Sequence, residues 1–157
     1  MAVTYESAGR VRQKARERVR GTGAFFALKA FFLYAATHLK NPNLALLAFD
    51  SGDIDAAGGA VLADAACTVY FVYGKKRATD TDAYLALLDD ASDDSGGATD
   101  ARISVDFQSS EDEVVVWFPD GIDMAAGVVA KAYTDYDGTT DSTAGDAPDG
   151  FVIVAAN

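Results

Sequence analysis

The sequence has little of what catalytic and metal sites are usually built from. It contains one cysteine, Cys67, and one histidine, His38. A single cysteine excludes a disulfide within the chain and a zinc site made of several thiolates. Cys67 begins an apolar run without a basic neighbour that would lower its pKa, so we interpret it as a small buried residue. We interpret His38 as a packed or capping residue, because no serine or cysteine set accompanies it.

A hydrophobic run long enough to cross a membrane is also missing. The apolar stretch 24–36 is divided by Lys29, whereas a span needs about 20 mostly apolar residues. No small-residue cleavage site closes the stretch, so it does not read as a signal peptide. A segment that is apolar on all sides is typical of a core or a subunit interface. Its pattern leaves open whether it is a helix or a pair of strands.

Glutamate is scarce, and aspartate takes its place. The 157 residues include 4 Glu and 20 Asp, and the net charge is −11. Aspartate favours turns and caps over helix interiors, which predicts many tight turns. A body this acidic would repel nucleic acid and anionic membranes, so we expect neither as a partner. The length fits one domain, or one domain with an arm.

Basic residues are concentrated at the N-terminus. Residues 1–40 hold 8 of the 13 Lys and Arg and only two acids. Val11, Ala15 and Val19 form an apolar stripe, which predicts a basic helix that docks on an acidic protein surface, with Gly21-Thr22-Gly23 as its hinge. A solvated, frayed terminus is the alternative, and contact with DNA or lipid is a further one. The basic residues are Arg10, Arg12, Lys14, Arg16, Arg18 and Arg20.

The pattern becomes that of β-strands along the chain. Asn41-Pro42-Asn43 predicts a turn and 44–49 a short strand, and we place the boundary between an N-terminal arm (1–60) and the body (61–157) near residue 60. Further strands are expected within 61–73, 82–88, 102–108, 114–118, 128–136 and 151–155. Short strands with Gly and Asp turns predict a mainly β fold, an antiparallel, jelly-roll-like β-sandwich.

One apolar strand has large aromatic side chains on both of its faces. Trp117 and Phe118 are neighbours and must point to opposite sides. One of them therefore covers a second surface, which is either a subunit contact or the underside of an overlying segment.

Acidic loops are the remaining candidates for metal binding. Asp135, Asp137 and Asp141 form D-x-D-G-x-x-D, a loose match to a calcium loop. The EF-hand pattern needs glycine at the sixth position and glutamate at the twelfth, and here the glycine is fourth and position 12 is Asp146. The loop 50–55 is a second loose acidic cluster. We interpret both as solvated turns and expect no metal.

Neighbouring carboxylates also occur in one long polar loop. Asp89-Asp90 and Asp93-Asp94 lie in a stretch with no apolar anchor. Catalytic carboxylates need a partly dry pocket that separates their pKa values, and the sequence supplies none here. No glycine-rich loop is followed by the lysine that phosphate binding requires. We therefore expect no enzyme activity and no cofactor.

The order of several motifs resembles a known module. The segments are DAYLALLD at 82–89, FPDGI at 118–122, GVVA at 127–130 and DYDGT at 135–139. Residues 61–157 thereby resemble a small β-sandwich module of tailed-bacteriophage virion structural proteins, which decorates or cements heads. The chain departs from that module at Leu88, where an aromatic residue is more usual, and in its N-terminal 60 residues.

The resemblance implies a non-enzymatic virion protein, made in the host cytoplasm and located on the capsid surface. It would be a capsid decoration or cement protein, or a minor capsid protein, with a major capsid or other virion protein as its partner. We expect a homo-oligomer, with a trimer as the first choice, because the apolar segments exceed what one small sandwich can hide. Besides the six basic residues, the expected contact residues are Phe25, Phe26, Phe31, Phe32 and Trp117.

Two other functions fit the same sequence. The first is a β-sandwich module at the tip of a fibre or tail that contacts a glycan on a host surface. It would require an exposed aromatic groove in the loops. The second is a small membrane protein anchored through residues 10–40, which would require partitioning into lipid.

Overall fold

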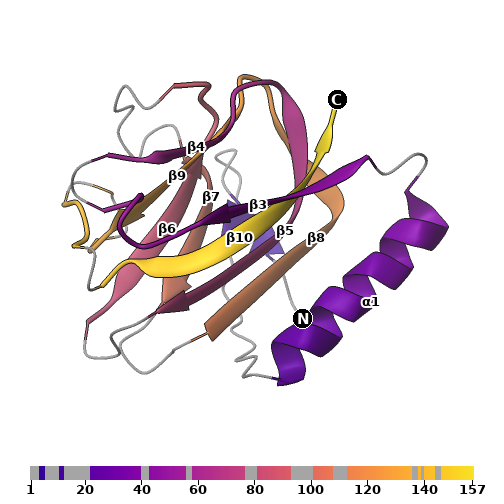
Figure 1. The fold of residues 1–157 in the computed structure, drawn as a ribbon, viewed down its shortest axis with the longest axis horizontal. Coiled ribbons are helices and arrows are strands. Elements are labelled where there is room, and N and C mark those ends of the chain that lie inside the picture. The colour runs from indigo at the N-terminus through magenta and orange to yellow at the C-terminus, as the bar shows by residue number, and fades with distance from the viewer. Residues whose placement is uncertain are drawn as a thin grey trace.

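The computed structural model of the chain is a two-layer β-sandwich with a helix outside it (Figure 1). The structure describes residues 4–5, 11–12, 22–39, 43–55, 58–76, 81–92, 101–107, 113–135, 138, 140–143 and 146–157, with side chains from residue 27 onward. Its elements are β1 (Thr4–Tyr5), β2 (Val11–Arg12), α1 (Thr22–His38), β3 (Leu44–Phe49), β4 (Ala60–Ala63), β5 (Cys67–Lys76), β6 (Ala83–Leu88), β7 (Ala101–Phe107), β8 (Glu113–Met124), β9 (Val128–Tyr133) and β10 (Pro148–Ala156).

The two sheets have the strand orders β1-β2-β7-β6-β9-β4 and β3-β10-β5-β8. Among the described strands only β2 and β7 pair in parallel, and every other pair is antiparallel. The predicted fold class, an antiparallel β-sandwich with a partly helical N-terminal part, is therefore confirmed. The last strand, β10, lies inside its sheet between β3 and β5 and is therefore paired on both sides.

Alternation along the strands places the main core between the sheets. Ile103, Val105 and Phe107 of β7 are buried there, as their period of two predicts. Leu85 and Leu87 of β6 join them from the neighbouring strand. The residues between these positions point to the outer faces of the sandwich, so the inner faces form one continuous apolar layer.

Two strands differ from their predicted ranges. The single strand expected over 61–73 is two strands, β4 and β5, which belong to different sheets. The strand expected to end at Pro119 continues to Met124 as β8. Gly121 has a φ of 72°, and the register with β5 shifts between Val69 and Phe71, so a bulge carries β8 past the proline.

The N-terminal part also differs from its prediction. Val11 and Arg12 form a strand beside β7, so the basic helix expected over 10–20 is wrong at these two residues. Residues 24–36 are helical, and α1 begins at Thr22, so Gly23 lies inside the helix instead of in a hinge. β3 pairs with β10, and the sandwich therefore includes residues upstream of the boundary expected near residue 60.

Candidate functional site

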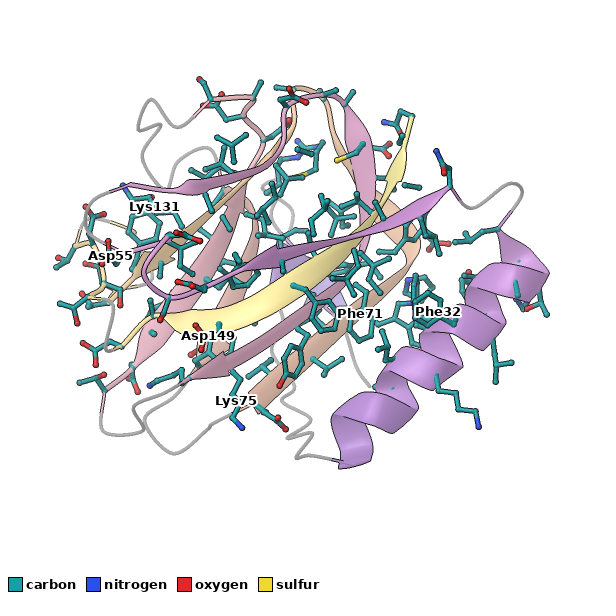
Figure 2. All side chains as sticks on the ribbon, in the orientation of Figure 1. Phe32, Asp55, Phe71, Lys75, Lys131 and Asp149 are labelled. Carbon is teal, nitrogen blue, oxygen red and sulfur yellow. The ribbon has the colours of Figure 1, made fainter. Side chains whose placement is uncertain are left out.

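Helix α1 covers part of the outer face of the four-stranded sheet (Figure 1). Phe31 and Ala35, one turn apart on the helix, are both buried against this face. The sheet contributes Phe71 from β5, Val115 from β8 and Ile153 from β10, and Figure 2 shows Phe71 on the side of the sheet that faces α1. These side chains form a second apolar core, separate from the one between the sheets.

Aromatic rings make up most of this second core. The ring centroid of Phe31 lies 5.5 Å from that of Phe71 and 5.9 Å from that of Trp117, with the tryptophan edge-on. The row continues across the sheet, where Phe151 stacks on Phe71 at 6.0 Å and on Tyr73 at 5.1 Å. Aromatic pairs in such geometries contribute about 0.5–1.5 kcal/mol beyond the area that they bury. The helix is thus held by the sheet and does not depend on its own propensity.

The position of Trp117 shows which second surface its strand covers. Phe118 is fully buried between the sheets, whereas Trp117 points outward and lies under α1. The Tyr34 ring meets Trp117 edge-on at 5.2 Å, and the Tyr34 hydroxyl donates a hydrogen bond of 3.0 Å to the Pro119 carbonyl. The second surface covered by this strand is therefore the chain's own helix.

The opposite side of α1 is exposed and largely apolar, with Lys29, Thr37 and His38 as its polar residues. Leu33 is 63% exposed and Phe32 is 46% exposed, and Ala36 and Lys29 also lie on the surface. A surface helix normally presents a polar face to water, and α1 has an apolar residue at most of these positions. We call Phe32 and Leu33 the helix surface. A contiguous apolar surface of this kind is typical of a contact site for another protein.

The helix surface faces in a defined direction. Phe32 and Tyr34 are two residues apart and therefore lie on opposite flanks of α1. Tyr34 bonds to β8, which is one edge of its sheet. Phe32 accordingly lies on the flank toward β10 and β3, while Leu33 points away from the sheet.

The other predicted contact residues are placed only in part. Phe31 and Trp117 lie in the core under the helix, where the packing of α1 on the sheet covers them. Arg12 lies in β2, opposite Ser104 of β7. The backbones of Phe25 and Phe26 lie in α1, and their side chains lie outside the described residues. Outside them too are Arg10, Lys14, Arg16, Arg18 and Arg20.

The acidic loops make structural interactions wherever they are described. Asp141 forms an ion pair of 3.3 Å with Lys131, whose ammonium lies 5.5 Å from the centre of the Tyr133 ring. The backbone carbonyl of Asp135 accepts a turn hydrogen bond from Gly138, and Asp137 lies outside the described residues. Within the described part of the chain, no group of three His, Cys, Asp or Glu could hold a metal ion.

Of the carboxylates considered for catalysis, Asp89 and Asp90 accept hydrogen bonds from loop amides, and Asp93 and Asp94 lie outside the described residues. Asp89 accepts a hydrogen bond of 2.7 Å from the Ala126 amide and lies 4.0 Å from the Arg102 guanidinium. Asp90 accepts a hydrogen bond from the Ser92 amide, and Asp50 accepts one from the Gly52 amide. The bonds of Asp90 and Asp50 are the local ones that short acidic side chains make in loops, whereas Asp89 joins two segments that are distant in sequence.

An apolar hollow of about 310 Å³ opens between the two sheets beside β3 and β4. Its walls include Ala45 and Leu47 of β3, Leu62 of β4 and Cys67 at the start of β5. Burial, with a smaller contribution from the charge of Asp89, raises the pKa of the Cys67 thiol. Cys67 is thus a neutral packing residue and not an activated nucleophile, as its sequence context predicts.

Sequence reasoning missed a buried lysine and a polar cluster beside it at one end of the sandwich. Lys76 at the end of β5 is buried, and its ammonium donates to the Thr81 carbonyl. Asp146 accepts hydrogen bonds from the hydroxyls of Thr81 at 2.5 Å and Thr143 at 2.8 Å, and these bonds lower its pKa. Lys76 lies in a run of three basic residues, Lys75-Lys76-Arg77, which predicts a solvated turn. Only the period of the preceding strand could have indicated that Lys76 points inward.

Comparison with family models, with curated proteins and with solved structures found no match to this chain. Among the described residues, no helix is long and apolar enough to cross a membrane. The candidate site therefore depends on the geometry of the helix surface alone.

Proposed function

We propose that the protein is a non-enzymatic structural subunit that associates with copies of itself through the helix surface. The observation that carries the proposal is the packing of α1, which buries Phe31 on an aromatic sheet face and leaves Phe32 and Leu33 exposed on its other sides. A helix with large apolar side chains on opposite sides is most stable when both sides are covered. The sheet covers one side, and a neighbouring subunit would cover the other.

The finer proposal is a role in a virus particle. The motif order that resembles phage head-decoration modules favours a capsid decoration, cement or minor capsid protein. The motifs behind the resemblance are structural ones. A module of this kind would contact its neighbour through the helix surface. A trimer with three α1 helices around the axis is the assembly that this version of the proposal expects.

The experiment compares two lysine substitutions at exposed apolar positions. Leu33→Lys changes the helix surface, and Val61→Lys is the matched control, because Val61 is 44% exposed on β4 in the other sheet. Association is measured by sedimentation velocity from about 1 to 100 µM, at a salt concentration where charge effects are screened. We expect Leu33→Lys to weaken association about tenfold or more, since a lysine in a closed apolar contact is unpaired and about 1.4 kcal/mol is a factor of ten.

Circular dichroism and thermal unfolding serve as the folding controls. Both variants should unfold like the parent chain, because neither side chain is part of a described core. Equal association by the parent chain, Leu33→Lys and Val61→Lys would exclude the helix surface as the contact.

A further inference from the structure

The edges of the two sheets differ in how they are protected against pairing with another strand. Natural proteins blunt exposed edges with short strands, charges, proline or bulges. β8 is one edge of the four-stranded sheet, and it carries Pro119, Asp120 and a bulge at Gly121. The Tyr34 hydroxyl also donates a hydrogen bond to the Pro119 carbonyl. β4 is an edge of the other sheet, and it is only four residues long with a register shift.

β3 is the other edge of the four-stranded sheet and has none of these features. Its sequence, LALLAF at 44–49, contains no charge, proline or glycine. It pairs with β10 in unbroken register over six residues, and no described strand pairs with its other side. Ala45, Leu46 and Ala48 are exposed, with Leu46 at 54%. A strand that is regular, apolar and open at its edge is a template for a further strand.

Apolar surface is present on both faces of this edge. Leu46 lies opposite Ile153, which belongs to the core under α1, so Leu46 is on the helix side of the sheet. Leu47 lies opposite Val152, which belongs to the core between the sheets. The hollow of about 310 Å³ opens on that inner face, beside Ala45 and Leu47. A strand added at this edge would cover Leu46 on one face and the hollow on the other.

We propose that β3 pairs antiparallel with β3 of a second copy of this chain, about a two-fold axis, so that one sheet runs through both copies. A second copy offers the same uncharged, regular edge, and charge restricts where and in which orientation two copies can meet. With a net charge of −11, two copies can approach closely only where each offers an uncharged segment, and β3 is such a segment. The nearest acid in sequence is Asp50, directly after β3, and Asp64 lies on the wall of the hollow.

Antiparallel pairing keeps the Asp50 residues of the two copies at opposite ends of the contact. Strands rise about 3.4 Å per residue, and pairing centred on Leu46 separates the two Asp50 residues by about eight residues, or roughly 27 Å, beyond the Debye length of about 8 Å at physiological salt. Parallel pairing would place them side by side, where like charges are destabilising.

The alternation of side chains fixes the register. Residues directly opposite in an antiparallel pair share a face. One residue of β3 must therefore lie opposite its own copy, with the two-fold axis midway between the two. Centred on Leu46, the pairing places the two Leu46 side chains together and Leu44 opposite Ala48 on the helix side. On the inner face it places Leu47 opposite Ala45, over the mouth of the hollow. This contact goes beyond the proposed function, because it involves another surface and needs no contribution from α1.

The experiment is thiol cross-linking of a Leu46→Cys variant. The native cysteine is buried and its pKa is raised, so an introduced surface thiol reacts in preference. Opposed residues in an antiparallel pair have Cα atoms about 4.5–5.5 Å apart, within the usual range for a disulfide. Under mild oxidation at micromolar concentration we expect most of the Leu46→Cys chain to become covalent dimer. Val61→Cys, the matched control, should stay monomeric on the same non-reducing gel.

Two further variants distinguish the β3 pairing from contact through the helix surface. Leu46→Lys places like charges opposite each other and should weaken dimer formation about tenfold or more without changing thermal unfolding. Leu33→Lys combined with Leu46→Cys should still cross-link, which shows that the contact does not depend on the helix surface. The β3 pairing would be overturned if the parent chain associates but Leu46→Cys gives no more covalent dimer than Val61→Cys. The helix surface would then remain as the proposed contact. A parent chain that stays monomeric at every concentration would overturn both proposals.

Discussion

Phe31 is the residue on which the position of the helix depends most directly. Its side chain is fully buried between α1 and the sheet and touches the rings of Phe71 and Trp117. Truncation removes these contacts and leaves a cavity, because the surrounding rings are held by their own strands. We expect Phe31→Ala to lower the free energy of unfolding by about 3–5 kcal/mol, and Leu33→Ala, at an exposed position, to change it by less than about 0.5 kcal/mol.

Urea unfolding followed by tryptophan fluorescence measures both variants, since Trp117 is the single tryptophan and lies in the same cluster. Similar losses for Phe31→Ala and Leu33→Ala would mean that α1 does not pack on the sheet as described.

Asp146 connects stability to pH. Hydrogen bonds from Thr81 and Thr143 lower its pKa from the ordinary value of 3.8. A carboxyl group whose pKa is lower in the folded state stabilises the fold above its unfolded pKa, and this contribution is lost as the pH falls through the folded value. Asp146 is largely accessible to solvent, so the effect is small. We expect Thr81→Val to lower the free energy of unfolding by less than about 1 kcal/mol at pH 7, with the difference disappearing as the pH falls through the lowered pKa of Asp146.

Chemical denaturation of the parent chain and Thr81→Val at several pH values provides this comparison. A difference that stays constant down to pH 2.5 would show that the Thr81 hydroxyl acts through packing and not through the Asp146 carboxylate.

At the scale of elements, the sequence predicts periodic strands well and long-range partners poorly. The alternation at 102–107 identifies the buried face of β7 without further information. Residues 24–36 have no such period, and their helical state follows from an aromatic sheet face assembled by three distant strands. β3 is recognisable as a strand, but its partner β10 lies about 100 residues later in the chain. Local sequence patterns therefore cannot predict where β3 lies in the sandwich.

The candidate site shows the same division. The sequence predicts Phe32, Phe31 and Trp117 alike as contact residues. The structure leaves Phe32 exposed and places Phe31 and Trp117 beneath the helix. Which side of an all-apolar helix faces water depends on where its partner sheet lies. The free edge of β3 has no sequence signal beyond the absence of charge, because edge position is a property of the whole sheet.

Gly150 lies where three strands approach one another closely. It lies in β10 opposite Phe49 of β3 and Gly74 of β5. A Cβ at this position would lie 2.1 Å from the Tyr73 carbonyl oxygen and 2.8 Å from the Phe49 ring. Backbone cannot yield as a flexible side chain does, so we expect Gly150→Ala to destabilise the fold by about 1–3 kcal/mol. Gly52→Ala, in an exposed turn where the nearest contact is 3.3 Å, should cost less than about 1 kcal/mol.

Thermal unfolding monitored by far-ultraviolet circular dichroism compares the two glycine variants. A Gly150→Ala chain as stable as the parent would contradict the close approach of β10 to β5.

At the scale of the whole molecule, the charge of −11 opposes folding through self-repulsion. Raising the salt concentration from about 0.1 to 1 M shortens the Debye length from about 10 to 3 Å and screens this repulsion. We expect the melting temperature to rise by several degrees over this range. Differential scanning calorimetry in sodium chloride measures the change, and a melting temperature that falls with salt would show that attractive ion pairs dominate the folded state.

Salt also separates the two ways in which the chain could attach to a neighbour. Contacts made by the basic residues 10–20 should weaken as salt rises, and substitution of Arg12, Arg16 and Arg20 should weaken them further. Contacts through the helix surface and through β3 are apolar and should hold or strengthen under the same conditions.

The mass of the full chain in solution tests the central claim most directly. Multi-angle light scattering at about 10–100 µM in 1 M sodium chloride measures association where electrostatic contacts are screened and apolar ones are retained. The account predicts a species at a multiple of the 16.5 kDa chain mass, with its proportion increasing with concentration. A single species at 16.5 kDa across the whole range would contradict it.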